Sequence, residues 1–134
     1  MRSCKTCNTV KPLSDFSSYK HPNGVVYRAH NCKLCRNVAN RERNWKRVGI
    51  VNATLAAYKQ QLINQDFKCA VCNTDLVEHK NMHNAAHLDH DHTTGLARGV
   101  LCNGCNAGLG MFKDDTKRLQ SAIDYLLKYK DSYA

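Results

Sequence analysis

The sequence has few aromatic residues and no long apolar run. Aromatic side chains make up 7% of its 134 residues and the mean hydropathy is −0.56, so we do not expect a large apolar core. No segment is apolar for long enough to span a bilayer, and the first ten residues lack the apolar stretch of a signal peptide. We therefore expect a cytoplasmic protein that does not bind membranes, in a compartment where thiols stay reduced.

Acidic residues are scarce in the first fifty positions, where only Asp15 and Glu42 occur. The same segment holds eleven lysines and arginines and so carries the whole net charge of +9. A basic block of this kind favours a polyanionic partner such as DNA or RNA; the alternative is a solvated face that only aids solubility. The candidate nucleic-acid contacts in this block are Arg28, Lys33, Arg36, Arg41, Arg43, Lys46 and Arg47.

All eight cysteines fall into Cys-x-x-Cys pairs: Cys4/Cys7, Cys32/Cys35, Cys69/Cys72 and Cys102/Cys105. Two such pairs supply the four thiolates of a structural zinc site. Disulfides and a redox dithiol are the alternatives, but a reducing compartment and the lack of a thioredoxin-like pattern disfavour them. Joining neighbouring pairs closes the shorter loops, which costs less conformational entropy. We therefore predict two zinc ions, one bound by the first two pairs and one by the last two. The alternative, crossed pairing, would require interleaved modules.

The order of the patterns indicates an α+β protein with three parts. Residues 1–36 are expected to form a four-cysteine zinc module, and residues 37–65 a basic helical connector with its first helix over 37–48. The last part, 66–134, is expected to contain, in order, a strand over 87–92, a strand over 98–101, a helix over 103–112 and a helix over 116–129 capped by Asp114, Asp115 or Thr116.

The run HLDHDH, at residues 87–92, crowds together side chains that bind metals. If four cysteines already satisfy one zinc ion, the side chains left for another ion are Asp89, His90, Asp91, His92 and Asn106. Carboxylate and amide oxygens suit Mg²⁺, and a neutral imidazole beside such an ion can take a proton from water. Together with the basic surface, these groups indicate metal-assisted phosphodiester hydrolysis. The alternative is that HLDHDH only binds zinc, because imidazole also binds zinc.

HLDHDH, the preceding CAVC and the following RGVLCNGCN resemble the phage recombination endonuclease VII family. That family belongs to the HNH, or His-Me finger, nucleases. The resemblance covers residues 67–112 and implies a small zinc-stabilised ββα-metal core, preceded here by a four-cysteine zinc module and connecting helices. Residues 1–36 are similar to zinc-binding N-terminal extensions of some phage HNH proteins. The resemblance further implies a phage-encoded protein that acts in a bacterial host.

The same resemblance implies a role for each residue of the motif. Asp89 and Asn106 would be the protein ligands of a catalytic Mg²⁺ or Mn²⁺ ion, His90 the general base, and His92 a group that orients or contacts the scissile phosphate. Arg98, on the second strand, is our own addition to this set. We expect it either to contact a phosphate or to be a solvated strand residue.

Two features of the motif depart from a simple assignment. Successive residues of a regular strand face opposite sides, so Asp89 and His90 can address one phosphate only if the strand ends or bulges there. Some members of the family also carry a carboxylate three residues after the asparagine, where this chain has Leu109. A metal here would then have more water ligands. Asp91 could compensate, but we expect it to orient a histidine.

These observations predict a metal-dependent endonuclease that hydrolyses DNA phosphodiester bonds, acting as a nicking or homing enzyme. One alternative is an enzyme that resolves branched DNA such as a Holliday junction, and another is a host- or phage-DNA degrading nuclease. Resolving enzymes usually present two sites on a dimer, and no long apolar dimerisation helix stands out. A non-catalytic zinc-ribbon regulator that binds nucleic acid is a further alternative. The sequence leaves both a monomer and a homodimer open.

Overall fold

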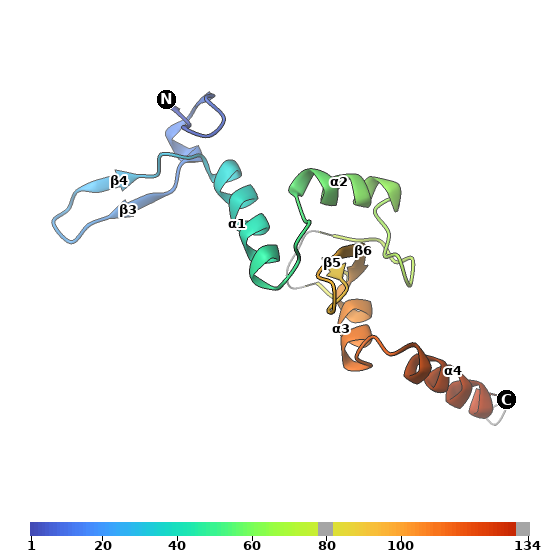
Figure 1. Ribbon diagram of the computed structural model, residues 1–134. Coiled ribbons are helices and arrows are strands. Elements are labelled where there is room, and N and C mark those ends of the chain that lie inside the picture. Colours follow the sequence, from blue (N-terminus) through green and yellow to red (C-terminus); the bar gives the residue numbers. More distant parts are fainter. Residues whose placement is uncertain (78–81, 131–134) are drawn as a thin grey trace. The chain divides into compact units, whose positions relative to one another are not determined.

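The computed structural model describes residues 1–77 and 82–130. The chain forms two compact units, Met1–Leu55 and Ala56–Ala134, which are described separately below (Figure 1). Both helices and short antiparallel hairpins are present, as expected of an α+β protein. Among the described residues, no helix is long and apolar enough to cross a membrane.

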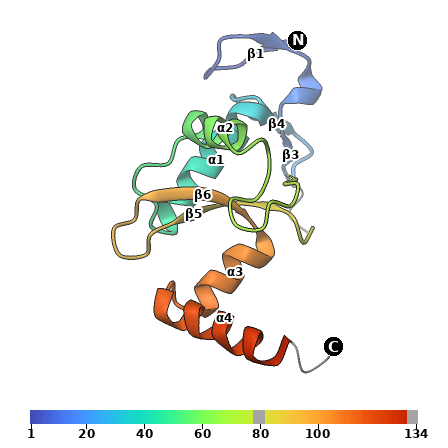
Figure 2. The ribbon, with the colours of Figure 1, turned by 90° about the vertical axis from the view of Figure 1, so that its right-hand side faces the viewer.

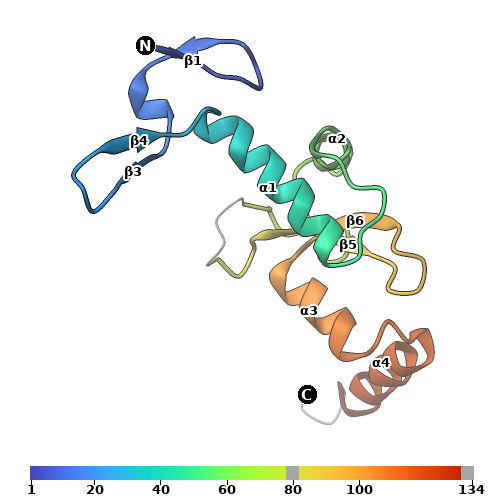
Figure 3. The ribbon, with the colours of Figure 1, turned by 60° about the vertical axis from the view of Figure 1, so that its left-hand side comes forward.

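The first unit is built on two small hairpins and one long helix. Its core contains buried Cys4, Phe16 and Cys32, with Cys35 packed against them. This cluster takes the place of a large apolar core, as the composition predicts. The elements in order are β1 (Arg2–Ser3), β2 (Val10–Lys11), a single 3-10 turn (Leu13–Asp15), β3 (Ser18–Lys20), β4 (Val26–Arg28) and α1 (Lys33–Arg47). Figure 3 shows the β3–β4 hairpin extending away from α1.

The helix α1 begins at Lys33, four residues before the position that the sequence predicts. Cys32 is its N-cap in extended conformation, and the N–H of Arg36 donates to the Cys32 carbonyl oxygen at 3.0 Å. The prediction ended the zinc module before the helix, whereas the second cysteine pair itself starts the helix. One helical turn brings residues three apart to the same side, so Cys32 and Cys35 reach one cluster.

The second unit contains a β-hairpin followed by a helix. Strands β5 (Ala86–His90) and β6 (Ala97–Cys102) pair antiparallel, and α3 (Asn103–Met111) packs against both. Figure 2 shows α3 leaving the end of β6 and running away from the hairpin. Helix α2 (Leu55–Asn64) precedes this unit's hairpin and α4 (Thr116–Lys130) follows α3. Cys69, Leu101 and Cys102 form a buried cluster in this unit.

The pairing of β5 with β6 is interrupted next to the predicted catalytic residues. Leu88 pairs with Val100, but His90 pairs with Ala97, so the register shifts between Leu88 and His90. The strand then ends at His90, two residues before the predicted end at His92. Asp89 and His90 can address one phosphate only if the strand bulges or ends there. Both features are present at this point of β5.

A glutamine side chain covers the outer edge of β6. Gln65 accepts a hydrogen bond from the Val100 N–H and donates one to the Val100 carbonyl, both at 2.8 Å. The Ala70 N–H also donates to that carbonyl at 3.2 Å. A Cβ atom at Gly99 would lie 3.2 Å from both the Ala70 Cβ and the Gln65 Oε1. This edge therefore fixes β6 against the loop that carries Cys69.

Candidate active site and metal centres

The eight cysteines gather into two clusters of four. Cys4, Cys7, Cys32 and Cys35 form one, and Cys69, Cys72, Cys102 and Cys105 form the other; within each, the sulfur atoms lie within 4.8 Å of one another. The Sγ atoms of Cys72 and Cys102 are 3.7 Å apart, close to the separation of about 3.8 Å that Zn–S bonds of about 2.3 Å produce in a tetrahedron. All eight thiols are free. Both clusters could hold zinc, and the predicted nearest-neighbour pairing is confirmed.

Backbone amides favour a thiolate in each cluster. The N–H groups of Cys32 and Cys7 lower the pKa of Cys4 to about 6; the Cys32 N–H lies 3.2 Å from the Cys4 sulfur. Burial raises the pKa of Cys69, but the N–H groups of Cys102 and Cys72 outweigh it and lower that pKa to about 6. The neighbouring Cys32 sulfur raises the pKa of Cys35 to about 12. Crowded sulfurs of this kind resist a second negative charge unless a cation joins them.

Asp89 is buried and paired with an arginine from the neighbouring strand. Its side chain is 8% exposed. Arg98 Nε donates to one Asp89 carboxylate oxygen at 2.6 Å, and an Arg98 terminal nitrogen donates to the other at 3.0 Å. Hydrogen bonding to Asp89 is the main cause of the raised pKa of Arg98. A buried carboxylate needs such a counter-charge; Arg98 provides it, although its own side chain is 37% exposed.

The two histidines predicted to be catalytic lie side by side just after the bulge. The ring centroids of His90 and His92 are 4.6 Å apart, with the planes tilted by 51°. His92 Nδ1 lies 2.7 Å from an Asp114 carboxylate oxygen, and the same oxygen accepts a hydrogen bond from Arg98 at 3.3 Å. The His92 bond is the main cause of the lowered pKa of Asp114. A chain of contacts thus joins Asp89 to both histidines.

Asp114 is a site residue that the sequence reasoning missed. The pattern offered it only as one of three possible caps of the last helix. In the structure Asp115 is that cap, because its Oδ1 accepts hydrogen bonds from the N–H groups of Lys117 and Arg118. Lys113 and Asp114 both have left-handed backbone, with φ of 55° and 54°. Two successive residues in this uncommon conformation turn the chain and bring the Asp114 carboxylate to His92.

A cavity of about 440 Å³ opens beside this network. Its lining residues are Asp91, His92, Thr93, Arg98, Gly110, Lys113 and Asp114. Lys113 is therefore a second residue that the sequence reasoning did not assign to the site. Three of these side chains are cations or imidazoles, which suits an anionic group such as a phosphate.

Asn106 lies in α3, four residues before Gly110. Asn106 is half-buried, and neither it nor Asp89 or His90 is among the residues that line the cavity. Leu109 packs against the buried cluster of Cys69, Leu101 and Cys102. Leu109 thus contributes to the cysteine-rich core of this unit and offers no oxygen ligand to a metal.

Asp91 does not take the role predicted for it. One of its carboxylate oxygens accepts hydrogen bonds from the N–H groups of Thr93 and Thr94 at 2.8 and 2.9 Å, and these bonds lower the pKa of Asp91. It thereby shapes the turn after β5. The carboxylate that contacts a histidine is Asp114.

The predicted nucleic-acid contacts of the first unit cluster on α1. Lys33, Arg36, Arg43 and Arg47 are exposed, and their spacing of three, seven and four residues places them along one stripe of the helix. Lys46 is also exposed, whereas Arg41 is half-buried with its guanidinium 5.5 Å from the centroid of the Trp45 ring. Arg28 lies in β4 and donates to the Leu13 carbonyl.

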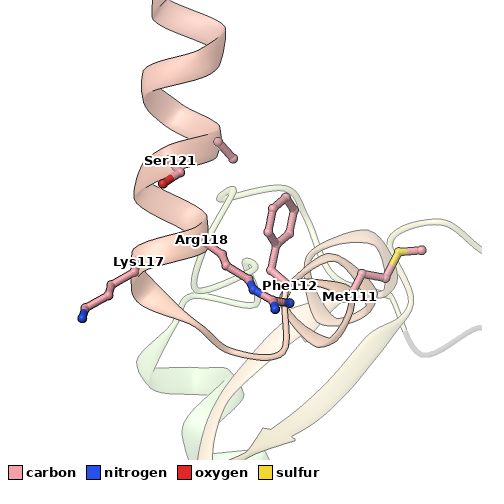
Figure 4. A pocket seen from close by; sticks show the side chains of 6 residues that line it. Met111, Phe112, Lys117, Arg118 and Ser121 are labelled. Carbon is pink, nitrogen blue, oxygen red and sulfur yellow. The ribbon is translucent and has the colours of Figure 1, made fainter.

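A second hollow lies between the end of α3 and the start of α4 (Figure 4). It has a volume of about 550 Å³ and is lined by Met111, Phe112, Lys117, Arg118, Ser121 and Ala122. Its lining contains no carboxylate, thiol or imidazole. The hollow is therefore separate in chemistry from the cavity at His92, and we assign it no catalytic role.

Comparison with known proteins identifies the family. The family model described as recombination endonuclease VII matches residues 40–128. The chain belongs to the recombination endonuclease VII family. The gene 59 protein of Mycobacterium phage D29 is 42% identical over 65 residues, which is 48% of this chain and 37% of that protein. The gene 59 protein of Mycobacterium phage L5 is 38% identical over 64 residues, 47% of this chain and 37% of that protein.

The chain matches little more than a third of the length of these two relatives. Among solved structures, the crystal structure of the ββα-Me type II restriction endonuclease Hpy99I covers 95% of this chain, at 27% identity and a TM-score of 0.42, with 65% of that chain covered in return. Membership of the endonuclease VII family confirms the resemblance read from the motifs, and the relatives are phage proteins.

Proposed function

We propose that this endonuclease VII family member is a metal-dependent endonuclease that hydrolyses DNA phosphodiester bonds. The observation that carries the proposal is the continuous network from buried Asp89 through Arg98 and Asp114 to His92 and the adjacent His90. It joins carboxylates, imidazoles and a guanidinium in one network, of which His92, Arg98 and Asp114 line the cavity. Such a set suits the hydrolysis of an anionic ester.

The donor set fits a hard divalent cation. We propose Asp89 and Asn106 as the residues that hold Mg²⁺ or Mn²⁺, because both present oxygen ligands. When bound, the ion would neutralise charge on the phosphate and on the departing oxygen. Both carboxylate oxygens of Asp89 accept hydrogen bonds from Arg98. A bound cation would therefore share the Asp89 carboxylate with the Arg98 guanidinium. Asp114, which already contacts Arg98, gives that guanidinium a second acceptor.

Each histidine then has a separate task. His90 is the proposed general base that takes a proton from the attacking water. His92 is held through Nδ1 by Asp114, which leaves Nε2 for a phosphate oxygen. Arg98 and Lys113 line the same cavity and are the proposed contacts to the flanking phosphates. The basic stripe on α1 would grip the DNA backbone, with affinity that falls as salt rises.

A plasmid cleavage assay tests the proposal. Wild-type protein with Mg²⁺ or Mn²⁺ should cut supercoiled DNA, and His90→Ala should lower the rate by about 100-fold or more, since general base catalysis contributes about that much. His83→Ala is the matched control, because His83 is an exposed histidine of the same unit outside the network. The proposal is wrong if the wild-type protein binds DNA but does not cut it, whichever divalent ion is added. That result would favour a non-catalytic zinc-ribbon regulator.

The preferred substrate follows from the same assay with linear, supercoiled and four-way DNA. Single-strand nicks in supercoiled DNA, with four-way junctions cut no faster, support the nicking or homing enzyme that we propose. Paired cuts that are faster on four-way junctions would favour a resolving enzyme instead. Gel filtration with light scattering then tells a monomer from a homodimer.

A further inference from the structure

The β3–β4 hairpin has a chemistry that the proposed active site does not use. Tyr19 pairs directly with Tyr27 across the two strands. The ladder continues as the His21 N–H donates to the Val25 carbonyl at 2.9 Å. Because side chains alternate along a strand, the two tyrosines and His21 lie on one face of the ribbon. The register places Ser18, Lys20, Val26 and Arg28 on the other face.

The rings on the first face touch one another edge to face. The His21 centroid lies 6.3 Å from that of Tyr19 and 6.2 Å from that of Tyr27, with interplanar angles of 82° and 80°. Contacts of this kind hold the rings in place. Even so, 61% of Tyr19 and 54% of Tyr27 is exposed. In a chain with so few aromatic residues, this preformed and open aromatic face stands out.

The turn at the tip keeps the hairpin rigid without covering this face. Gly24 adopts φ of 90° and its N–H donates to the His21 carbonyl, while the Asn23 side chain accepts a hydrogen bond from the Val25 N–H at 3.0 Å. Figures 1 and 3 show the hairpin reaching away from α1. The rings therefore form a fixed platform and need little ordering when a ligand binds.

Charge identifies the partner of this face. The unit that carries the hairpin has the whole net charge of +9; Lys20 and Arg28 are next to the tyrosines along their strands, with side chains on the opposite face of the ribbon. A polyanion with flat apolar groups matches both features at once. Nucleic acid with unstacked bases is such a ligand, because its phosphates meet the cations and its bases can stack on aromatic rings. Bases inside an intact duplex offer only their edges.

We infer that the aromatic face of the β3–β4 hairpin binds unpaired DNA bases, as in a single strand or at a strand branch. The inference rests on the proposed function only for the choice of DNA as the nucleic acid. It goes beyond that function because it assigns recognition of unstacked bases to a surface apart from the cavity at His92.

Fluorescence anisotropy with the full chain tests this inference. The probes are a labelled single-stranded oligonucleotide and the duplex of the same sequence, without added divalent ions so that nothing is cut. Tyr19→Ala and Tyr27→Ala should each weaken single-strand binding by about 5-fold or more, the usual loss of one base–aromatic stack, and leave duplex binding within about twofold. Phenylalanine at either position should keep wild-type binding, because a ring without its hydroxyl still stacks.

Two controls separate stacking from misfolding and from charge. Val26→Ala changes an equally exposed residue on the opposite face of the same ribbon (53% exposed) and should have no effect. Each alanine variant should keep the wild-type zinc content, since the clusters lie outside the hairpin. The salt dependence of single-strand binding should also be unchanged in the tyrosine variants, because no phosphate contact is removed.

The inference is overturned if the tyrosine variants bind the single strand like wild type, or if they lose duplex and single-strand binding alike. A loss that phenylalanine does not restore would also overturn it. Its failure is distinguishable from failure of the proposed function. Normal plasmid cleavage with unaltered binding by the tyrosine variants refutes only the inference, whereas tyrosine-dependent binding by a chain that cuts nothing refutes only the nuclease.

Discussion

Replacing Asp114 with asparagine should lower the rate of DNA cleavage much more than it lowers the stability of the fold. The carboxylate is 21% exposed, but its partners His92 and Arg98 are 62% and 37% exposed. Ion pairs with solvent-exposed partners contribute less than about 1 kcal/mol to folding. We therefore expect Asp114→Asn to lower the free energy of unfolding by less than about 1 kcal/mol in a urea titration.

The effect on activity should be larger than this. Asp114 fixes Nδ1 of His92 and contacts the arginine that neutralises Asp89, and loss of such an orienting partner typically costs about 10- to 100-fold in activity. That range corresponds to about 1.4 to 2.7 kcal/mol of transition-state stabilisation. The measurement is the rate of plasmid cleavage at saturating DNA, together with DNA binding in the absence of divalent ions, which should stay within about twofold of wild type.

The neighbouring carboxylate provides the matched control. Asp115 caps α4, and asparagine caps a helix about as well as aspartate, so Asp115→Asn should cleave like wild type. If Asp114→Asn also cleaves within about twofold of wild type, the assigned positioning role of Asp114 is wrong. If it loses cleavage only in proportion to lost folded protein, the carboxylate is merely structural.

The acid dependence of stability gives a further check on the same contact. His92 and then Arg98 lower the pKa of Asp114 from its ordinary value of 3.8. The contribution of ionised Asp114 to the free energy of unfolding is therefore complete above the unfolded-state pKa of about 3.9. It is lost as the pH falls through the lower pKa of the folded state. The small stability difference between wild type and Asp114→Asn should be constant near neutral pH and shrink in that acidic window.

Three other predictions concern the scaffold. The protein should contain two zinc ions per chain by metal analysis, and Cys69→Ser should remove one of them and unfold the second unit by circular dichroism. Gln65→Ala should lower the free energy of unfolding by about 1–3 kcal/mol, because the Val100 N–H loses its side-chain acceptor at a buried edge and the Val100 carbonyl keeps only the Ala70 N–H. Gly99→Ala should cost about 1–3 kcal/mol through the 3.2 Å contacts of a new Cβ, whereas Gly104→Ala, with open space around it, should be neutral or stabilising.

Much of the local structure could be predicted because it depends on neighbours in the chain. The four Cys-x-x-Cys pairs and the cost of closing long loops were enough to predict which cysteines share a cluster. The turn at His21–Gly24 and the strand after it also follow from residue types with strong backbone preferences. Boundaries were less predictable: α1 starts at Lys33 because Cys32 caps it, a capping role that no propensity assigns to cysteine.

The sequence by itself determined the grouping of the cysteines, the basic first unit and the motif of Asp89, His90 and Asn106, because residue type and short spacing are visible in one dimension. Only the tertiary structure decided which carboxylate serves His92 and which charge neutralises Asp89. Those pairings join residues 9 to 22 positions apart through a strand bulge and a left-handed turn. Because a turn can aim either of two adjacent aspartates at the site, the choice between Asp114 and Asp115 rests on backbone geometry that the pattern of residues does not record.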